Sequence, residues 1–595
     1  MEELLSQSTE SHKSAPRTTC SLLHALLSLP ITLRRVLLLA AVVFVVSSFV
    51  LLARLNDRFL VEVPRHGGTL AEGIIGRPRF INPIIAKSDA DRDMSQLIYS
   101  GLLSATEDGT LVPDLASNYS ISPDGLTYTF TLRPELLWHD GEPITSADIA
   151  FTIDKVRDQG LVIKSPRRAS WEGVEVETPD PLTVIFHIKQ PYAPFLESTT
   201  MGILPKHIWQ NVPNDEFDVT YYNIKPIGSG PFRVKSVMQD KDNGLPQYYD
   251  LVAWKQYAKG EPFIEDLRIV FFGNNKDLTQ AYADHVIDQM HTVEPSLAGS
   301  LEAAGAQIER APLPRIFALY FNQNKAPIFA DKTVRKSLAL SVDKEKIVTD
   351  VLFGYGRTID SPLPFLDTPD ENTNDAAITP LERITKARDL LESNGWAPNA
   401  LGIYQKTDKK TKTVTTLDFS IAIPDVPELK QAGELVKADW EKLGARVTLR
   451  VFESSSFTTE VLSPRKYDVL LYGQIIGRTP DPFAYWHSSQ RNAPGLNIAF
   501  YANKKVDTLL ENARKERDSE KRNTILSQFV TELTSDVPAV FIYSPDFLYA
   551  TSNKVRGIHA GLITMESERF LGIENWYIES ERVWKWFEGD TVRPN

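Results

Sequence analysis

The sequence predicts an α/β fold, because short strand patterns alternate with amphipathic helical patterns along most of its length. The chain has 595 residues, of which 42% are hydrophobic and 24% are charged, as is typical of a globular protein. At about 150 residues per domain, this length predicts three or four structural units. The formal net charge of -12, without a dense run of Lys and Arg, indicates that nucleic acid is not a partner.

The N-terminal region contains one candidate membrane-spanning segment, residues 36–53. These 18 residues carry no charge and two serines as their polar side chains, and a helix of this length is barely sufficient to cross a bilayer. Arg34 and Arg35 immediately precede the segment, and positive residues tend to remain in the cytoplasm. We therefore expect a cytoplasmic tail at residues 1–35, a single-pass anchor in the cell membrane, and an extracytoplasmic C-terminal domain.

The segment fits two alternatives to an anchor less well. A cleaved signal peptide has a shorter apolar core followed by small residues, whereas this segment ends at Ala53 and continues with Arg54. A bacterial lipoprotein needs a cysteine directly after the apolar run, but the single cysteine, Cys20, precedes it. One cysteine also excludes an intramolecular disulfide, so burial alone must stabilise the external domain.

Residues 124–154 contain a strand and a turn in direct succession before a helix. Tyr128, Phe130 and Leu132 alternate with threonines, as a half-buried strand requires. Asp140 and the glycine after it supply the turn. The pattern predicts a strand whose apolar face packs on a core.

The helix of this stretch has a clear start signal. Thr145 is expected to cap the helix and Asp148, three residues later, to complete a capping box. Ile149, Ile153 and Val156 then form an apolar stripe at helical spacing.

The same alternation of patterns continues to the C-terminal region. Strands are predicted at residues 183–188, 269–272, 317–321, 447–452, 469–472 and 539–543, and helices at 332–341, 344–353 and 429–443. Asp343 is expected to cap the second of these helices and Gly354 to end it.

Several motifs in order along the chain resemble one protein family, the family-5 extracellular solute-binding proteins, which serve peptide and nickel ABC importers. The motifs are the stretch 124–154, Gly228-Ser229-Gly230-Pro231-Phe232, the block 327–335 with Asp343, the segment 387–396, Tyr467-Asp468 and Asp481-Pro482-Phe483. The resemblance covers the chain from about Gly67 to its C-terminal end.

This resemblance implies a two-lobed, periplasmic-binding-protein-like (class II) fold with an extra subdomain in the N-terminal lobe and a ligand cleft between the lobes. Carried onto this chain, it predicts a stalk at 54–66, a lobe I base at 67–82, 225–312 and 531–590, an extra lobe I subdomain at 83–224, and lobe II at 316–530. The crossings between lobes are expected near 315–322 and 537–543.

Enzyme motifs are missing from the sequence. There is no Gly-x-Ser-x-Gly elbow, no phosphate-binding loop ending in Gly-Lys-Ser/Thr and no His-Glu-x-x-His pair, and the ten histidines are scattered. His139 and Asp140 lie in the predicted turn, where a structural role is expected. The sequence indicates no catalytic residue, no metal site and no cofactor, and a hydrolase is kept as a remote alternative.

One residue of the resemblance departs from the family pattern. In the dipeptide and oligopeptide receptors, an Asp three residues before the acidic-Pro pair holds the ammonium group of the ligand, and here that position, counted from Asp481, is Arg478. A buried cation facing an ammonium would be unfavourable by several kcal/mol. Arg478 is therefore predicted to bind an anionic ligand group, with a structural ion pair as the alternative.

Four further residues near Arg478 are candidate ligand contacts: Tyr472, Gly473, Tyr485 and Trp486. Glycine lets a ligand backbone approach closely, and the aromatic side chains can form apolar walls, although aromatic residues are equally typical of a core. We expect a monomeric receptor that binds a peptide or peptide-like solute and delivers it to the permease subunits of an ABC importer. The alternative from the sequence is a tethered sensor on the same fold, without import.

Overall fold

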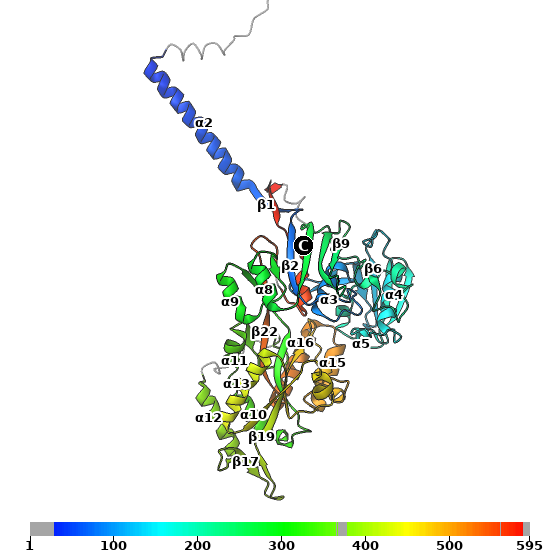
Figure 1. Cartoon of the computed structure of the whole chain (residues 1–595), viewed down its shortest axis with the longest axis vertical. Helices are drawn as coiled ribbons and strands as arrows, with labels where there is room; N and C mark the ends of the chain where they lie inside the picture. The colour runs from blue at the N-terminus through cyan, green and yellow to red at the C-terminus, as the bar shows by residue number, and fades with distance from the viewer. Residues whose placement is uncertain (1–28, 365, 367–377, 560, 587–595) are drawn as a thin grey trace, which may run out of the picture. The chain divides into compact units, whose positions relative to one another are not determined.

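The computed structural model describes residues 29–364, 366, 378–559 and 561–586 (Figure 1). Contacts within the chain define two units, one comprising residues 1–65 with 580–595 and the other residues 66–579. Each unit is described separately. Cys20 and most of the predicted cytoplasmic tail lie outside the described residues.

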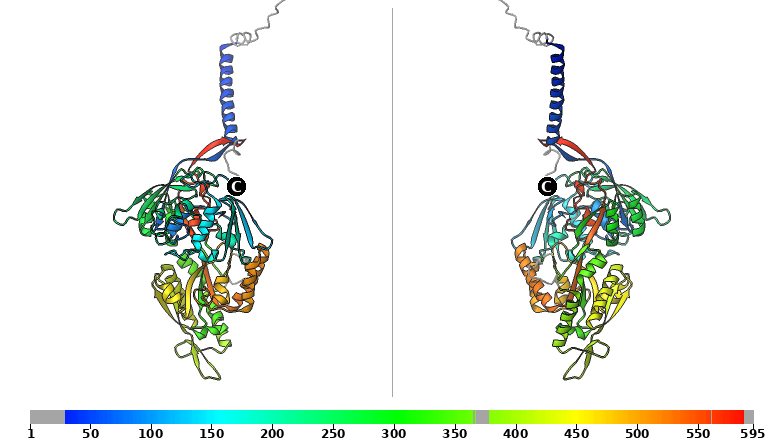
Figure 2. Two further views of the ribbon diagram at one scale, coloured as in Figure 1. Left: turned by 90° about the vertical axis from the view of Figure 1, so that its right-hand side faces the viewer. Right: turned by 90° about the vertical axis from the view of Figure 1, so that its left-hand side faces the viewer.

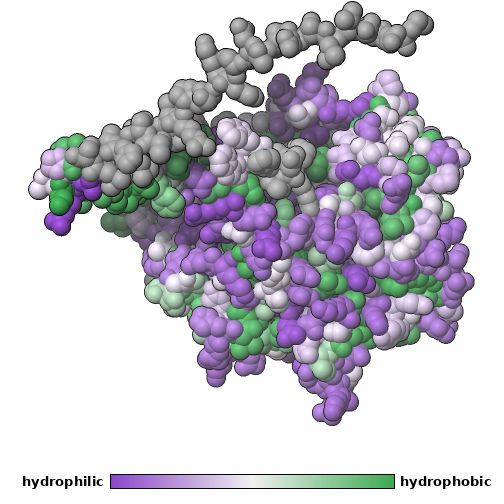
Figure 3. All heavy atoms as spheres, turned by 90° about the horizontal axis from the view of Figure 1, so that it is seen from above, coloured by the Kyte–Doolittle hydropathy of each residue, from purple (hydrophilic) through white to green (hydrophobic). Residues whose placement is uncertain are grey.

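The smaller unit is built on helix α2 (Ile31–Phe59), none of whose apolar stretch is buried. Hydrophobic side chains gather along this helix, whereas the visible face of the rest of the molecule mixes hydrophilic and hydrophobic side chains (Figure 3). The helix extends beyond the predicted segment 36–53 at both ends. Residues 54–66, predicted as a stalk, instead form the end of α2 and strand β1 (Leu60–Arg65), which pairs with β23 (Glu579–Trp584).

The larger unit is organised by one sheet of 12 strands in the described part of the chain, along the order β20-β19-β21-β14-β22-β12-β2-β11-β10-β9, with β13 and β15 also paired to β22. The strands are β2 (Thr69–Ile75), β9 (Phe232–Gln239), β10 (Pro246–Ala253), β11 (Asp266–Phe272), β12 (Gln289–Met290), β13 (Gln307–Pro312), β14 (Arg315–Phe321), β15 (Gly356–Thr358), β19 (Asp418–Pro424), β20 (Arg446–Phe452), β21 (Val469–Ile475) and β22 (Ala539–Thr551).

Strand β22 belongs to both halves of this sheet. Its first residues pair with β14, where Ala539 lies opposite Tyr320, and its last residues pair with β13, where Thr551 lies opposite Gln307. The hydrophobic cores divide at the same place. The residues of the largest core precede β14 or follow residue 546, and the residues of two other cores lie between positions 316 and 543. We call the part on β2 and β9–β13 lobe I and the part on β14 and β19–β21 lobe II.

Lobe I also contains a four-stranded sheet in the order β5-β6-β8-β7, and shorter elements surround it (Figure 1). The four strands of this sheet are β5 (Ala116–Ile121), β6 (Thr127–Leu132), β7 (Glu175–Asp180) and β8 (Thr183–His187). A separate pair of strands is formed by β3 (Leu103–Ala105) and β4 (Leu111–Pro113). The helices of lobe I are α3 (Asp89–Ile98), α4 (Ser146–Arg157), α5 (Arg168–Trp171), α6 (Phe195–Ser198), α7 (Lys206–Trp209), η1 (Tyr221–Asn223), α8 (Asn275–Ala283), α9 (Pro295–Ala303), η6 (Glu566–Phe570) and η7 (Ile573–Asn575).

In lobe II, helices pack on both faces of the sheet. They are η2 (Pro327–Ala330), α10 (Lys332–Ser341), α11 (Lys344–Leu352), α12 (Pro380–Ser393), α13 (Pro427–Leu443), η4 (Thr458–Leu462), α14 (Phe483–Trp486), η5 (Ser488–Gln490), α15 (Lys504–Lys515) and α16 (Ser519–Asp536). A small sheet of β16 (Ala397–Pro398), β17 (Tyr404–Thr407) and β18 (Val414–Thr416) completes the lobe.

The local predictions from the sequence agree closely with these elements. All six predicted strands and all three predicted helices are present, and α10 has the predicted bounds. At the start of α4, the Thr145 amide donates to Asp148 Oδ2 at 2.8 Å, which confirms the reciprocal half of the capping box. At the end of α11, Phe353 takes the left-handed conformation with φ 53° and the predicted Gly354 follows it with φ 82°, so the left-handed turn begins one residue earlier than predicted.

His139 has the structural role that its place in the signature predicts. It is buried, its Nε2 lies 3.1 Å from the carbonyl oxygen of Gly230, and its Nδ1 lies 3.3 Å from the amide nitrogen of Gly228. The imidazole thus ties the turn of the signature to the glycine-rich turn before β9. Burial is the main reason why the pKa of His139 falls to about 4.

We predict that His139 makes the protein sensitive to acid. Its folded-state pKa of about 4 lies below the ordinary value of 6.5, so the unfolded chain binds the proton first as pH falls. This contribution to stability is present above about pH 6.5 and is lost toward pH 4, at about 1.4 kcal/mol per pH unit. Chemical denaturation at pH 6 and pH 5 should show a shallower pH slope for His139→Gln than for the wild type, and equal slopes would contradict the assignment.

Candidate functional site

A cavity of about 660 Å³ lies where the two lobes meet beside β14, β21 and β22. Lobe I contributes Thr292, Val293, Pro295, Phe547 and Leu548 to its lining, and lobe II contributes Phe317, Leu352, Leu429, Phe457, Tyr472 and Gly473. The cavity is therefore formed jointly, and a molecule within it contacts both lobes. A volume of this size is typical of sites for small molecules and short peptides.

Strand β21 presents an unpaired edge to this cavity. It pairs with β14 along its whole length, but with β19 at Val469 and Leu470 alone. The Ile476 amide donates to Pro314, so every second residue, including Gln474, exchanges hydrogen bonds with β14. The residues between them, such as Gly473, direct their N–H and C=O groups to the other side.

Gly473 keeps this edge accessible. A Cβ atom added at Gly473 would lie 2.8 Å from the Phe317 ring, so any larger residue would displace that ring, which lines the cavity. The missing side chain and the unpaired peptide groups together allow another extended backbone to approach β21.

The walls beside this edge are aromatic. Phe457 stacks on Tyr472 with ring centroids 5.8 Å apart, and Phe317 stacks on Tyr543 at 4.9 Å. All four rings line the cavity. Such walls offer apolar contacts to ligand side chains without requiring one particular side chain.

Gln474 is a buried polar side chain at this cavity whose whole amide group lacks a partner within the described residues. It is 5% exposed, and neither its amide nitrogen nor its amide oxygen has a hydrogen bond within the described residues. Leaving a buried amide without partners costs about 1 to 3 kcal/mol. The arrangement is suited to a ligand that supplies one donor and one acceptor at this point.

Arg478 forms ion pairs with carboxylates of the protein and does not line this cavity. Its guanidinium donates to Glu568 of η6 at 2.8 Å and lies 3.9 Å from Glu197 of α6, and its side chain is 5% exposed. The amides of Arg478 and Thr479 also donate to the Glu197 carboxylate, at 3.3 and 3.2 Å. Burial raises the pKa of Glu197, and the adjacent amides and Arg478 oppose that rise. The contact joins the loop after β21 in lobe II to two elements of lobe I.

The structure separates the other predicted contacts into two groups. Tyr472 and Gly473 line the cavity. The Tyr485 hydroxyl donates to the Ile475 carbonyl at 2.8 Å, so it holds the end of β21. Trp486 lies in the core of lobe II, in edge contact with Phe541, and does not line the cavity. A ligand role for Arg478, Tyr485 and Trp486 stays a prediction.

Sequence reasoning missed Gln474, Phe317 and Phe457. Gln474 carried a signal, since it is a single amide within the apolar strand pattern of residues 469–476. Phe317 and Phe457 carried none, because an aromatic residue in a strand or a helix is typical of any core.

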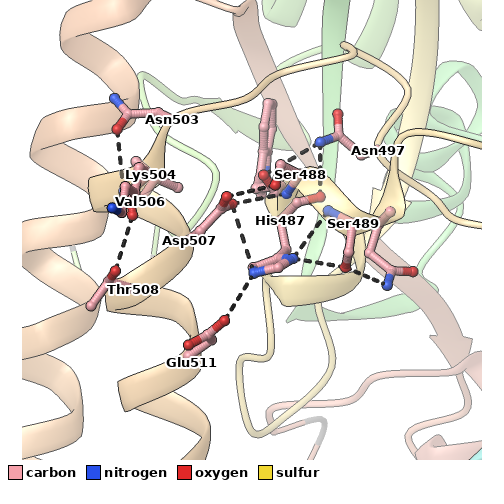
Figure 4. Close-up of polar contacts among 12 residues, drawn as sticks. His487, Ser488, Ser489, Asn497, Asn503, Lys504, Val506, Asp507, Thr508 and Glu511 are labelled. Atoms are coloured by element: carbon pink, nitrogen blue, oxygen red, sulfur yellow. Dashed lines mark hydrogen bonds and ion pairs between the residues drawn. The ribbon is translucent and has the colours of Figure 1, made fainter.

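His487, directly after α14, lies in a cluster of polar side chains (Figure 4). His487 Nδ1 accepts a hydrogen bond from the Ser489 amide, and its Nε2 lies 3.8 Å from Asp507 and 3.4 Å from Glu511. Asp507 also accepts hydrogen bonds from the amide and hydroxyl of Ser488. These contacts fix η5 and hold it on α15, which is a structural role.

Comparison with known proteins assigns the fold. The family model for bacterial extracellular solute-binding proteins, family 5 middle region, matches residues 110–496. The chain belongs to this family. Family 5 relatives include the oligopeptide-binding protein AppA of Bacillus subtilis, which is 28% identical over 514 residues that cover 83% of this chain and 89% of AppA.

Solved structures of family 5 type agree with the two-lobed architecture. AppA from Bacillus subtilis in complex with a nonapeptide is 25% identical with a TM-score of 0.67, covering 87% of this chain and 100% of that one. NikZ from Campylobacter jejuni in complex with Ni(L-His) is 26% identical with a TM-score of 0.67, covering 86% and 99%. The substrate-binding protein CtaP from Listeria monocytogenes has a TM-score of 0.71 at 24% identity, covering 86% and 100%.

We predict that Arg478 and Glu568 are energetically coupled. Arg478→Met leaves the largely buried Glu568 without its cation and should lower the free energy of unfolding by about 3 kcal/mol. The double variant Arg478→Met/Glu568→Gln should recover part of that loss in chemical denaturation, and additive losses would contradict the coupling. Arg517→Met is the control, because Arg517 also reaches lobe I but through exposed carbonyls of Ser122 and Pro123.

Proposed function

We propose that this protein is the extracytoplasmic receptor of an ABC importer and binds peptides or peptide-like solutes between its two lobes. The single observation that carries the proposal is the unpaired edge of β21 inside the cavity shared by both lobes. An extended ligand can add to this edge as a further strand, with Gly473 as the point of closest approach. The names of the family 5 relatives, AppA among them, support the same class of ligand.

Binding of this kind forms no covalent bond and needs no catalytic group. The backbone of β21 supplies hydrogen bonds that are independent of ligand sequence, and the aromatic walls accept different side chains. Gln474 adds one polar contact that fixes the ligand along the strand. We therefore propose a receptor that tolerates varied side chains and selects for an extended backbone, and we propose no enzymatic activity.

The contacts between the lobes indicate how binding couples to closure. Besides the contacts of Arg478, the Tyr192 hydroxyl of lobe I donates to the Asp481 carboxylate of lobe II at 3.3 Å. Arg514, also of lobe II, donates to the same carboxylate at 2.9 Å. The Arg514 carbonyl also accepts from the Ala193 amide at 3.1 Å. These polar contacts lie outside the cavity, so they can break and form without changing its walls. We propose that a ligand stabilises the closed arrangement by contacting both lobes.

The division into lobes that the resemblance implies is part of this proposal. Lobe II comprises residues 316–530, and lobe I comprises a base at 67–82, 225–312 and 531–590 with an extra subdomain at 83–224. The pairing of β22 with β14 and then with β13 supports crossings at these places.

Helix α2 is proposed to anchor the receptor in the membrane. Its exposed apolar surface and its length of 29 residues are sufficient to span a bilayer. No cysteine follows the helix in the sequence, so attachment through a lipid-modified cysteine is not proposed. The charged pair Arg34 and Arg35 would then stay in the cytoplasm, and the ligand-binding unit would face outward.

We predict that the anchor is not cleaved. Protease added to intact cells without an outer envelope should digest the ligand-binding unit and leave a membrane-embedded fragment that contains Cys20. A membrane-impermeant thiol label applied to the same cells should detect Cys20 after the membrane is permeabilised and not before. Recovery of a soluble form that begins near Arg54 would overturn the anchor.

We predict that Gln474 contributes to peptide affinity but not to stability. Gln474→Met keeps the volume of the side chain and removes two polar atoms that have no partner in the unliganded protein, so stability should hold or rise. Calorimetric titration with a pool of di- to nonapeptides should show binding to the wild type and a loss of about 1 to 3 kcal/mol in the variant. Gln431→Met is the matched control, since the Gln431 amide donates to the Asp350 carbonyl and does not line the cavity. No binding of any peptide by the wild type would refute the proposed ligand class.

A further inference from the structure

Three aromatic side chains gather at the C-terminal end of α2. Phe59, the last residue of the helix, stacks on Trp586 with ring centroids 6.0 Å apart, and Trp584 lies 5.7 Å from Trp586. All three remain exposed, Trp586 to 76%, Trp584 to 42% and Phe59 to 42%. Large exposed aromatic groups in contact with one another need an explanation, because burying them in a core or an interface is favourable.

Backbone pairing holds this cluster beside the helix. Strand β1 follows Phe59 directly and pairs with β23, which carries Trp584 (Figure 2). Val63 of β1 is 2% exposed, and the Ser580 hydroxyl donates to Glu62 across the two strands. The tryptophans, more than 500 residues from α2 in sequence, are thus fixed to the point where the helix ends.

The length of α2 places that point at a definite depth. The uncharged residues 36–53 span about 27 Å at 1.5 Å per residue, close to the hydrocarbon thickness of about 30 Å. Phe59 follows Ala53 by six residues, or about 9 Å of helix. The headgroup layer extends roughly 5 to 8 Å beyond the hydrocarbon on each side. With a modest tilt of the helix, Phe59 and the rings stacked on it lie in this interfacial layer.

We propose that β23 and the two residues after it form a second membrane contact, in which Trp584 and Trp586, together with Phe59, occupy the headgroup layer of the outer leaflet. Tryptophan favours this layer because its ring is apolar and its N–H is polar. Arg58, in the last turn of α2, and Lys585, between the two tryptophans, place cations where lipid phosphates lie. The proposal rests on α2 being the anchor.

This contact gives the C-terminal strand a role that a single spanning helix lacks. A helix alone allows the chain beyond it to rotate freely about residues 60–66. Strand pairing with β23 and the insertion of two indole rings at the same level restrict that rotation near the bilayer. The C-terminal strand thereby fixes the first residues outside the membrane.

The test uses tryptophan fluorescence of the full chain in phosphatidylcholine nanodiscs, with and without a lipid that carries a nitroxide on its headgroup. Of the ten tryptophans, the proposal places Trp584 and Trp586 within reach of this quencher. The lipid should quench part of the wild-type emission, and Trp584→Phe/Trp586→Phe should lose at least half of the quenched part. Trp254→Phe/Trp396→Phe, which removes two tryptophans of the other unit, should retain it.

Each other outcome overturns the proposal. Equal quenching of the wild type and Trp584→Phe/Trp586→Phe would show that the pair lies outside the headgroup layer. Emission that resists the lipid quencher but changes with protein concentration would indicate a second copy as the occupant. Flotation of the same preparations on a density gradient tests α2 separately, because a chain that does not float with lipid lacks the anchor itself, whereas one that floats without quenching refutes the role of β23 alone.

Discussion

The arrangement of β2, α3 and η6 within lobe I depends on one buried cation, Arg569. Its guanidinium donates to Glu72 of β2 at 2.6 Å and to Asp93 of α3 at 2.8 Å, and all three side chains are fully buried. The hydroxyl of Tyr549 in β22 donates to the second Glu72 oxygen at 2.8 Å. Taking these charges out of water is costly, so the group is stable because every charge faces an opposite one. Loss of Arg569 would leave two carboxylates buried and unpaired.

This cation matters for function because of its neighbours in sequence. Arg569 is part of η6, and the same short helix carries Glu566 and Glu568. Glu566 lies 3.5 Å from Arg315 at the start of β14, and Glu568 accepts from Arg478 after β21. The buried group therefore fixes the helix that presents two carboxylates to lobe II. Electrostatic pairing between the lobes is built on a rigid base rather than on a flexible loop.

The sequence could predict those parts of the fold whose signals are local. Alternation placed Tyr128, Phe130 and Leu132 on a buried face, and Asp343 was recognisable as a cap because capping depends on residues three positions apart. The partners of Arg478 were beyond such reasoning, since Glu568 is 90 residues and Glu197 281 residues away in sequence. The motif fixed the position of Arg478 but not what its side chain faces.

The same distinction explains the candidate site. Gly473 was predictable because a glycine inside an apolar strand suggests close approach of another backbone, but the unpaired edge itself depends on β19 diverging from β21 after Leu470. That divergence is a property of the sheet and has no signature in either strand alone.

The charge of the cavity lining bears on what the receptor selects. Among the described residues, the lining contains the carboxylates of Asp89, Glu428, Asp546 and Glu566 and the guanidinium groups of Arg92 and Arg315. Both arginines lie against carboxylates of that set, Arg92 against Asp89 at 2.6 Å and Arg315 against Glu566 at 3.5 Å. The other two carboxylates, Glu428 and Asp546, have no arginine of the lining against them. Burial raises the pKa of Asp546, and the nearby Arg310 and Arg357 oppose that rise.

An acidic cavity disfavours the anionic end of a ligand and favours its cationic end. Arg478, which the sequence suggested as the site of an anion, is held by Glu568 outside the lining. The lining carries four carboxylates and two guanidinium groups, so we propose that it favours an ammonium group of the ligand. The preference for the cationic end of a ligand would then come from the electric field of several charged groups around the cavity rather than from one carboxylate. Such a field tolerates ligands of different length, because no single contact fixes where the ligand charge must lie.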